Sequence, residues 1–484
     1  MKRGALTVVV ALVVVGVLAT RGAAWLRDRA TRRADPGARL PANGLLLTFR
    51  GDPLGTRLDE LRRFPAYRGL VGGGMTDKLR RAFRWGPSVK DPWAALSGSG
   101  SSVLGLYRKG WIVVRPGGAA LPAEAITRDE GAWRLVASER SMLPSPGARR
   151  KVERTRGGGG GLEIEADLGA CLEAVGGASR DWEAILPRTV VGSIRAEGGR
   201  LEERWEIACG DACLLEWLDA RGTAATDARA WAAVSASASS LAWFLLDPRR
   251  LASPDGAPTT SGTPRPLARL EQMERFLGFP LRKEIASALA GPGVAALEES
   301  SGNDEPRLLL ALDLAFPERA SRALDRVAAL GVLSGAMHET TYRGVSIASW
   351  AFRGRRGGIE PAAAVDGGLL LLALRRADVA DAIDRLRSAR PSPLGGLRAE
   401  AASLPAASWK AASRSPSLVA AWERILGLDA PAHPSPPGVC RATLRKEGNL
   451  WILEGDGAAP ALAAEPLFPS LRRLARDWQE RESR

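Results

Sequence analysis

PRLLLALDLAFPERASRALDRV, residues 306–327, is the stretch from which the fold of this chain is most readily inferred. Residues 308–314 are apolar except for Asp313, and a short apolar run bounded by turn residues is typical of a buried strand. After Pro317, apolar side chains recur every three or four positions in residues 318–330, which predicts an amphipathic helix. The stretch therefore predicts a buried strand followed directly by a helix.

The segments on both sides of this stretch continue the pattern of short strands and helices. Helices are expected at 267–277, 281–289 and 378–387, and strands at 294–297, 345–352, 362–365 and 369–374. Nearer the N-terminus, hairpins are expected for 103–107 with 111–115 and for 194–196 with 201–207. Strands and helices in this order are typical of an α+β architecture with antiparallel sheets.

Three places in the chain open in the same way, which indicates internal repetition. A short apolar strand (45–49, 240–246 or 408–412) follows small residues or proline, and a helix with regularly spaced leucine or isoleucine comes after it. Chance order is the alternative, because the copies share little identity. We expect an α+β fold: an N-terminal transmembrane helix, then two repeated units, or three with the last opening, of antiparallel sheet with helices packed on one face.

Changes in composition set the expected limits of the domains. A loop rich in Pro, Gly, Ser and Thr at 252–266 is expected inside the second domain. The expected segments are a transmembrane signal anchor (1–26), a juxtamembrane spacer (27–40), a first α+β domain (41–222), a second α+β domain (223–400), and a third partial unit with a C-terminal helix (401–484).

Residues 4–20 (GALTVVVALVVVGVLAT) are an unbroken apolar or small-residue segment, preceded by Lys2 and Arg3 and followed by Arg21. A helix of roughly 17–25 such residues spans a bilayer, so the segment predicts a membrane anchor. A cleaved secretory signal, which has a shorter apolar region of about 7–15 residues, is the second alternative. A buried helix of a cytosolic protein is the third.

Arginines after this segment bear on the side of the membrane where the rest of the chain lies. They outnumber the two basic residues before it: Arg21, Arg27, Arg29, Arg32 and Arg33. Because Lys and Arg concentrate on the cytoplasmic side, this pattern alone would place the chain in the cytoplasm. A family resemblance described below favours export. We therefore expect a single-pass protein of the bacterial cytoplasmic membrane whose main domain is extracytoplasmic, with a cytosol-facing protein as the alternative.

The chain is strongly basic, with 68 Lys and Arg, 54 Asp and Glu and a net charge of +14. Such a charge favours a polyanionic partner, such as nucleic acid or anionic lipid. However, arginine far outnumbers lysine and is scattered along the chain among abundant Ala, Gly and Pro, which is typical of a GC-rich genome. We therefore do not expect nucleic acid as a partner.

Two of the four cysteines stand close together in Cys209-Gly-Asp-Ala-Cys213, where an expected strand (201–208) turns into an expected helix (211–220). A local disulfide fits this spacing and would persist only in an oxidising compartment. Free buried thiols, and metal or redox chemistry, are the alternatives. A zinc site would need further ligands, and the two histidines, His338 and His433, are far away in the sequence.

No catalytic, cofactor-binding or metal-binding motif is complete in the sequence. Glycines 157–161 precede a strand-like segment, whereas a phosphate loop needs Lys and a hydroxyl at a helix start. His338-Glu339 begins like a zinc-protease helix, but Tyr342 stands where the second histidine is needed. We expect no catalytic residues, no cofactor and no metal. If an active site assembles only in three dimensions, the candidate pairs are His338 with Glu339 and Asp313 with Glu318.

Residues 270–386 also resemble a known family. The resemblance rests on Gly-Pro-Gly-Val-Ala-Ala-Leu (291–297), on Tyr342-Arg343-Gly344-Val345-Ser346-Ile347, and on the closing AAAVDGGLLLLALRRADVADAIDRL (362–386). The matching residues make up about a quarter of the chain. They resemble the uncharacterised bacterial domain-of-unknown-function family numbered 3352. The resemblance implies a single-pass anchored protein with an extracytoplasmic α+β region, and it brings no catalytic residues with it.

These observations predict a non-enzymatic, membrane-anchored envelope protein that binds or scaffolds a ligand. The expected partners are the membrane, through the N-terminal segment, and an envelope protein, lipid or polymer. An envelope enzyme is one alternative, and a cytosol-facing anchored protein that binds anionic lipid or nucleic acid is the other.

Overall fold

The structure is a computed structural model. It describes residues 39–42, 44–64, 85, 92–96, 101–117, 125–130, 132–144, 161–167, 170–171, 187–210, 213–222, 229–252, 274–275, 278–298, 307–333, 337–350, 360–388, 396–414 and 438–457. Eighteen strands are found in these residues, and the strand pairings given below are all antiparallel. The chain divides into two compact units: Met1–Arg57 with Thr76–Leu162, and Leu58–Met75 with Glu163–Arg484.

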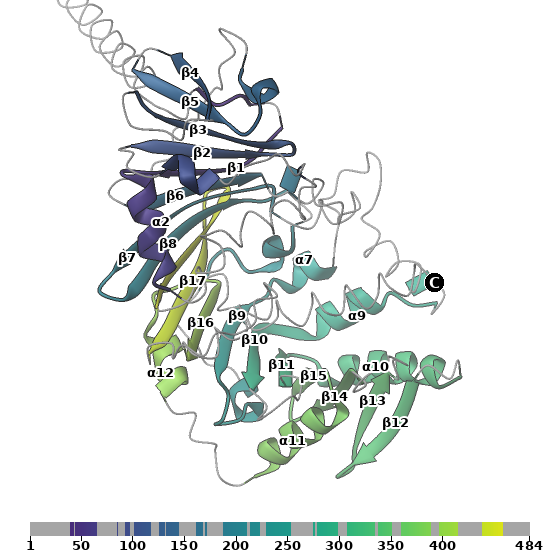
Figure 1. The fold of residues 1–484 in the computed structure, drawn as a ribbon. Coiled ribbons are helices and arrows are strands. Elements are labelled where there is room, and N and C mark those ends of the chain that lie inside the picture. The colour runs from purple at the N-terminus through teal and green to yellow at the C-terminus, as the bar shows by residue number, and fades with distance from the viewer. Residues whose placement is uncertain are drawn as a thin grey trace, which may run out of the picture. The chain divides into compact units, whose positions relative to one another are not determined.

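The first unit contains a five-stranded antiparallel sheet in the order β1-β2-β3-β5-β4 (Figure 1). Its strands are β1 (Leu45–Gly51), β2 (Ser102–Tyr107), β3 (Gly110–Pro116), β4 (Ile126–Glu130) and β5 (Trp133–Ala137). The helix α2 (Leu54–Arg62) begins in this unit, which also holds the 3-10 helices η2 (Pro92–Leu96) and η3 (Arg140–Met142). The predicted hairpin is confirmed, since β2 and β3 pair across Tyr107 and Gly110.

The core of the first unit is formed by alternating side chains of these strands. Val103, Ile112, Val114 and Leu135 are almost fully buried and pack together. Arg115 is also buried, and its Nη1 donates to the carbonyl oxygen of Ala95 in η2 at 2.7 Å. Burial lowers the pKa of this guanidinium. A buried charge of this kind needs such partners, so Arg115 fixes η2 against the sheet.

The second unit contains a twelve-stranded antiparallel sheet in the order β7-β8-β18-β17-β16-β9-β10-β11-β15-β14-β13-β12 (Figure 1). Its strands are β7 (Thr189–Glu197), β8 (Arg200–Ala208), β9 (Ser240–Leu245), β10 (Leu289–Glu298), β11 (Arg307–Leu314), β12 (Met337–Tyr342), β13 (Val345–Trp350), β14 (Ala362–Asp366), β15 (Leu369–Ala373), β16 (Trp409–Arg414), β17 (Val439–Glu447) and β18 (Leu450–Gly457). A further strand, β6 (Leu162–Asp167), lies at the unit boundary.

Helices cover both faces of this sheet. On one face, Val379 and Ile383 of α11 (Arg376–Arg387) and Leu397 of α12 (Gly396–Ser403) join a core cluster with Trp243 and Leu371. On the other face, α10 (Pro317–Leu333) packs Ala328 against Met337 and Ala348. The remaining helices are α7 (Pro248–Ala252), α9 (Leu281–Ala288), η4 (Leu214–Trp217) and η5 (Arg229–Ala233).

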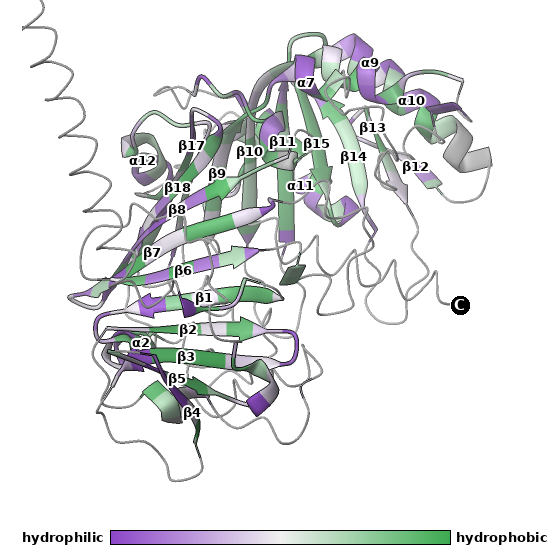
Figure 2. Ribbon diagram, turned by 90° about the horizontal axis from the view of Figure 1, so that it is seen from above, coloured by the Kyte–Doolittle hydropathy of each residue, from purple (hydrophilic) through white to green (hydrophobic). Residues whose placement is uncertain are grey.

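Both faces of the central strands are apolar, as Figure 2 shows for β11 and β15. In β11, the side chains of Leu309 and Ala311 lie on the face that α11 covers. Those of Leu308 and Leu312 point to the opposite face and are also buried. A strand that is buried on both faces has a continuous apolar sequence. This is why residues 308–314 are apolar except for Asp313 and do not alternate with polar residues.

The predicted fold class is wrong in its arrangement of repeated units. The strands that were expected to open the second and third copies, β9 and β16, are hydrogen-bonded neighbours, with Trp243 opposite Lys410. They therefore lie in the middle of one long sheet and do not begin separate sheets. Helices packed on both faces also contradict the prediction of helices on one face. The physical reason is that an unpaired strand edge is a liability, and the strand that covers it can be distant in the sequence, as β16 is from β9.

The predicted transmembrane helix is not part of the described fold, because residues 4–20 lie outside the described residues. Among the described residues, the structure has no helix of sufficient length and apolar character to span a membrane. The helix expected at 267–277 lies mostly outside the described residues, and so do residues 415–437, where the helix after the third opening strand was expected.

Gly192 provides a direct test of the packing on β7. It stands opposite Trp205 of β8, and a Cβ added at Gly192 would lie 2.1 Å from the indole ring. We expect Gly192→Ala to lower the free energy of unfolding by about 1–3 kcal/mol, because the ring has to leave its position. Urea unfolding followed by circular dichroism measures this change.

Gly396 is the matched control, because a Cβ there meets nothing within 4 Å. Gly396→Ala should leave the urea midpoint unchanged or raise it slightly. Equal midpoints for Gly192→Ala and the unsubstituted chain would contradict the packing described for Trp205.

Candidate functional site

Cys209 and Cys213, the pair singled out in the sequence, are brought together at the end of β8. Their Sγ atoms lie 2.8 Å apart, and both are free thiols in the structure. Cys213 is fully buried and Cys209 is partly exposed. The spacing of the two residues thus produced the expected contact, while the disulfide itself stays a prediction. The helix expected for 211–220 is reduced to the short 3-10 helix η4, which starts directly after Cys213.

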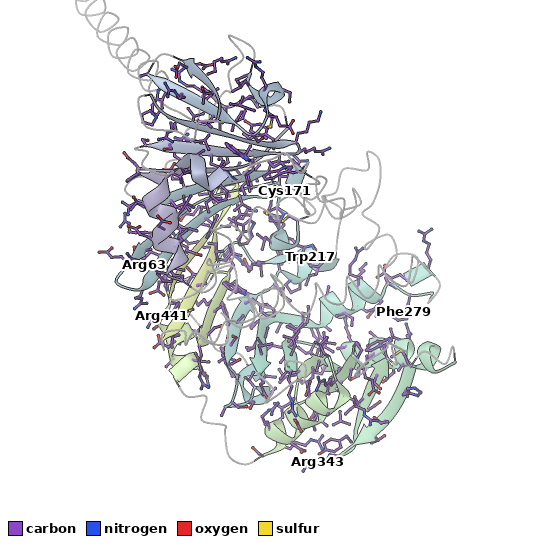
Figure 3. All side chains as sticks on the ribbon, in the orientation of Figure 1. Arg63, Cys171, Trp217, Phe279, Arg343 and Arg441 are labelled. Atoms are coloured by element: carbon purple, nitrogen blue, oxygen red, sulfur yellow. The ribbon has the colours of Figure 1, made fainter. Side chains whose placement is uncertain are left out.

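Glu216 of η4 holds this segment against three other elements. Its carboxylate accepts hydrogen bonds from Trp451 Nε1 of β18 at 2.8 Å, from Arg250 Nη1 of α7 at 2.5 Å, and from Lys446 Nζ of β17. The backbone is fixed as well, since Asp247 N donates to the carbonyl oxygen of Trp217 at 2.8 Å. Figure 3 labels Trp217 at this place in the chain.

The cluster perturbs the titration of its members. Burial alone would raise the pKa of Glu216, but the hydrogen bonds from Lys446, Trp451 and Arg250 outweigh it and hold the pKa below its usual value. The hydrogen bond between the two thiols lowers the pKa of Cys213 and raises that of Cys209. The two thiols are therefore coupled, so that the loss of a proton from one opposes its loss from the other.

The chemistry available to this arrangement is that of a dithiol beside a cation. A thiolate is the nucleophilic form of cysteine, and a second sulfur within contact distance can displace a group bound to the first. The part of the chain that the structure describes contains no group of three or more His, Cys, Asp or Glu that could hold a metal ion. The carboxylate of Glu216 already accepts hydrogen bonds from three donors.

The other candidate pairs from the sequence are not assembled into a site. Asp313 lies at the end of β11 and accepts hydrogen bonds from the backbone N–H groups of Arg229 and Ala230, both at 3.0 Å, so it caps η5. Glu318 is exposed in the first turn of α10. These two carboxylates thus have separate surroundings.

His338 and Glu339 are consecutive residues of β12, so their side chains point to opposite faces of the sheet. Both are exposed, and the carboxylate of Glu339 accepts a hydrogen bond from Ser346 Oγ of the neighbouring strand. The pair forms no shared site.

Sequence reasoning missed the residues that surround the cysteines, and it missed a charged surface on β8, β17 and β18. On this face, Arg204 pairs with Glu454, Arg200 with Asp456, and Arg445 Nη1 with Glu454 at 2.5 Å. Alternating charges in LEERWEI (201–207) were the available signal, because alternation in a strand places like positions on one face. These exposed pairs contribute little stability individually.

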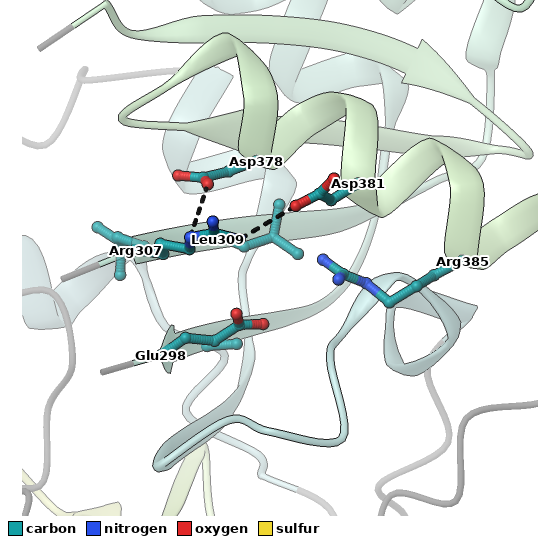
Figure 4. A pocket seen from close by; sticks show the side chains of 8 residues that line it. Glu298, Arg307, Leu309, Asp378, Asp381 and Arg385 are labelled. Atoms are coloured by element: carbon teal, nitrogen blue, oxygen red, sulfur yellow. Dashed lines mark hydrogen bonds and ion pairs between the residues drawn. The ribbon is translucent and has the colours of Figure 1, made fainter. Parts of the chain in front are cut away.

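A shallow depression lies beside α11, lined by Glu298, Arg307, Asp378, Asp381 and Arg385 (Figure 4). Its free space is about 10 Å³, roughly the room for one water molecule. Arg307 pairs with Asp381 at 3.1 Å and with Asp378 at 3.6 Å. Asp378 is 5% exposed, and neither of its carboxylate oxygens has a hydrogen-bond partner among the described residues. The depression is therefore too small for a substrate and is organised around an internal ion pair.

Comparisons with known proteins do not assign a family to the chain. No protein-family model and no curated protein matches it. Among solved structures, crystal form I of TP0453 is 12% identical with a TM-score of 0.27, covering 51% of this chain and 98% of that one. Crystal form III of TP0453 gives 12% identity and a TM-score of 0.26, covering 51% and 100%. Likenesses of this size support no statement about fold or activity.

Glu216→Gln tests the cluster around the cysteines. The amide has no charge for Lys446 and only one oxygen for three donors, so the free energy of unfolding should fall by about 2–4 kcal/mol at neutral pH. Because the pKa of Glu216 is lowered in the folded state, its contribution is complete above the ordinary glutamate pKa of about 4.3 and is lost as the pH falls through the folded value. Urea unfolding at several pH values measures both effects.

Glu447→Gln is the control for this substitution, since Glu447 lies on the exposed charged face and pairs with Arg445. It should change stability by less than about 1 kcal/mol. If Glu216→Gln is equally mild, Glu216 does not organise the cluster.

Asp378→Asn tests the buried ion pair beside α11. Burial raises the pKa of the Asp378 carboxyl, so this group favours folding in acid and opposes it as the pH rises past the ordinary value of about 3.9. The variant should therefore gain stability relative to the unsubstituted chain as the pH rises from about 4 to 7, reaching about 1 kcal/mol.

Asp381→Asn is the matched control, because Asp381 is 46% exposed and contacts the same arginine. Its stability difference should stay small over the same pH range. A loss of stability in Asp378→Asn at neutral pH would show that the Arg307–Asp378 attraction outweighs the cost of burying the carboxylate. Thermal unfolding followed by circular dichroism across this pH range measures both variants.

Proposed function

We propose that the protein is a non-enzymatic binding or scaffolding module of the bacterial envelope, attached to the cytoplasmic membrane through residues 4–20. The observation that carries the proposal is the way in which the second unit uses its polar groups. Two carboxylates of this unit, Asp313 and Glu216, hold backbone or side-chain donors of other elements. They thereby join distant parts of the chain, as expected of a rigid platform.

Two contacts illustrate this use of carboxylates. Asp313 satisfies two N–H groups at the start of η5, and Glu216 joins η4 to β17, β18 and α7. A catalytic acid or base instead needs a side-chain atom that faces a bound substrate within hydrogen-bond distance. The twelve-stranded sheet provides a long and rigid support, which suits a protein that holds a partner in place.

Membrane attachment is supported by the sequence alone. The length and composition of residues 4–20, with basic residues on both sides, are those of a segment that enters a bilayer. The resemblance to the family numbered 3352 favours an extracytoplasmic position for the rest of the chain. The expected ligand is an envelope protein, lipid or polymer.

The location is tested with the full chain carrying a C-terminal reporter enzyme that is active only outside the cytoplasm, expressed in a bacterial host. We expect an active reporter and a protein that resists alkaline extraction from the membrane, because the apolar segment enters the bilayer and directs export. Replacing Val9 and Val14 with Asp should release the protein, since charged side chains in the bilayer cost several kcal/mol.

The double variant Val9→Leu/Val14→Leu is the control and should stay in the membrane. An inactive reporter on a membrane-bound chain would contradict the envelope location and favour the cytosol-facing alternative. Release of the unsubstituted chain by alkaline extraction would contradict membrane attachment.

A further inference from the structure

The Cys209–Cys213 pair has the geometry of a reactive dithiol. The two Sγ atoms lie 2.8 Å apart, closer than two sulfur atoms in simple van der Waals contact, so only a small movement separates them from bonding distance. Cys209 is partly exposed and Cys213 lies fully buried behind it. An incoming reagent therefore meets Cys209 first, and Cys213 is in place to react with whatever Cys209 binds.

Charged groups from three elements surround the pair. Glu216 of η4 opposes the thiolate form of both cysteines, and Lys446 of β17 favours it more weakly. Arg250 of α7 contacts the same Glu216 carboxylate, so it reduces the negative charge near the sulfurs. The backbone N–H of Leu215 also favours a thiolate at Cys213. The charged groups around the two sulfur atoms are thus paired with one another, because the Glu216 carboxylate accepts hydrogen bonds from both Lys446 and Arg250.

We propose that Cys209 and Cys213 form a thiol–disulfide exchange site whose substrates are small disulfides of the glutathione class, and that Lys446 assists it by favouring the thiolate. This activity is separate from scaffolding and does not depend on the location of the protein.

The reaction balances in two displacement steps. Cys209 loses its thiol proton to water, and its thiolate attacks one sulfur of the small disulfide RSSR, forming a mixed disulfide and expelling RS⁻. The Cys213 thiol then loses its proton to RS⁻, which leaves as RSH, and the Cys213 thiolate attacks Cys209 Sγ. A second RS⁻ leaves and takes a proton from water. The dithiol is oxidised by two electrons, and one RSSR is reduced to two thiols.

Oxidation would form a disulfide at a junction of several elements of the second unit. The new bond would tie the residue before η4 to the end of β8, and η4 is already fixed to β17, β18 and α7 through Glu216. The oxidised form would therefore hold the junction of these elements more tightly than the reduced form. A small disulfide is favoured over a protein disulfide because Cys213 has no exposed surface.

The first experiment uses the purified full chain, reduced and then incubated in mixtures of reduced and oxidised glutathione. After acid quenching and maleimide labelling, peptide mass spectrometry should show that Cys209 and Cys213 lose their label together, in a peptide lighter by two hydrogen atoms. Cys213→Ser should accumulate glutathione on Cys209, and Cys209→Ser should leave Cys213 unmodified.

Two results would overturn the exchange site. One is full labelling of both cysteines in the unsubstituted chain under mixtures that oxidise a simple dithiol such as dithiothreitol. The other is a stable mixed disulfide on Cys209 of the unsubstituted chain, which would show that Cys213 does not displace it. Neither result depends on whether the variants fold, and neither bears on the scaffolding proposal, which is tested in the membrane.

The second experiment addresses Lys446. The rate of iodoacetamide reaction at Cys209, measured against pH, should have its midpoint moved to higher pH in Lys446→Gln, with a rate at pH 7 lowered about threefold or more. Lys283→Gln, which removes an exposed lysine from α9, should leave the profile unchanged. An unmoved midpoint in Lys446→Gln would remove Lys446 from the site.

Discussion

The pairing of β9 with β16 is the constraint on which the second unit depends. Without these backbone hydrogen bonds, the strands β7, β8, β18, β17 and β16 would form one sheet, and those from β9 to β12 would form another. Closing such a long stretch of chain costs entropy, and the cost grows slowly with length. It is offset by the core cluster that the join creates, in which Trp243, Leu241 and Ala412 pack with side chains from α11 and α12. The β9–β16 pairing is therefore a long-range contact, and it stabilises the strands on both sides of it.

A buried lysine sets the register of this join. Lys410 is fully buried opposite Trp243, its pKa is lowered by burial, and its Nζ donates to the carbonyl oxygen of Leu404 at 3.1 Å, just beyond the end of α12. A slip of one residue would turn Lys410 to the opposite face of the sheet, away from this carbonyl. Leaving a buried ammonium without its partner is costly. The positions of α12 and of β16 against β9 are thus determined together.

Local features of the fold could be predicted from sequence, and long-range ones could not. The apolar run at 308–314 and the glycine turns at Gly110 and Gly199 indicated β11 and two hairpins, because these depend on nearest neighbours alone. In contrast, a strand such as β16 carries no information in its own residues about whether it pairs with β9 or starts a new sheet. Similar openings therefore suggested repeated domains where the chain forms a single sheet.

In the candidate site, too, the local contact could be predicted from the sequence and the long-range contacts could not. Cys213 stands four positions after Cys209, and this short spacing was enough to predict that the two cysteines meet. Glu216 joins Lys446 and Trp451, which follow 230 and 235 residues later, and no pattern in the sequence links them. Those contacts depend on the pairing of β18 with β8 on one side, and on the pairing of β17 with β16 and of β16 with β9 on the other. The surroundings that tune the two thiols are consequently a product of the same long-range pairing that builds the sheet, so a change at the β9–β16 join would reach the chemistry of the cysteines through the strands between them.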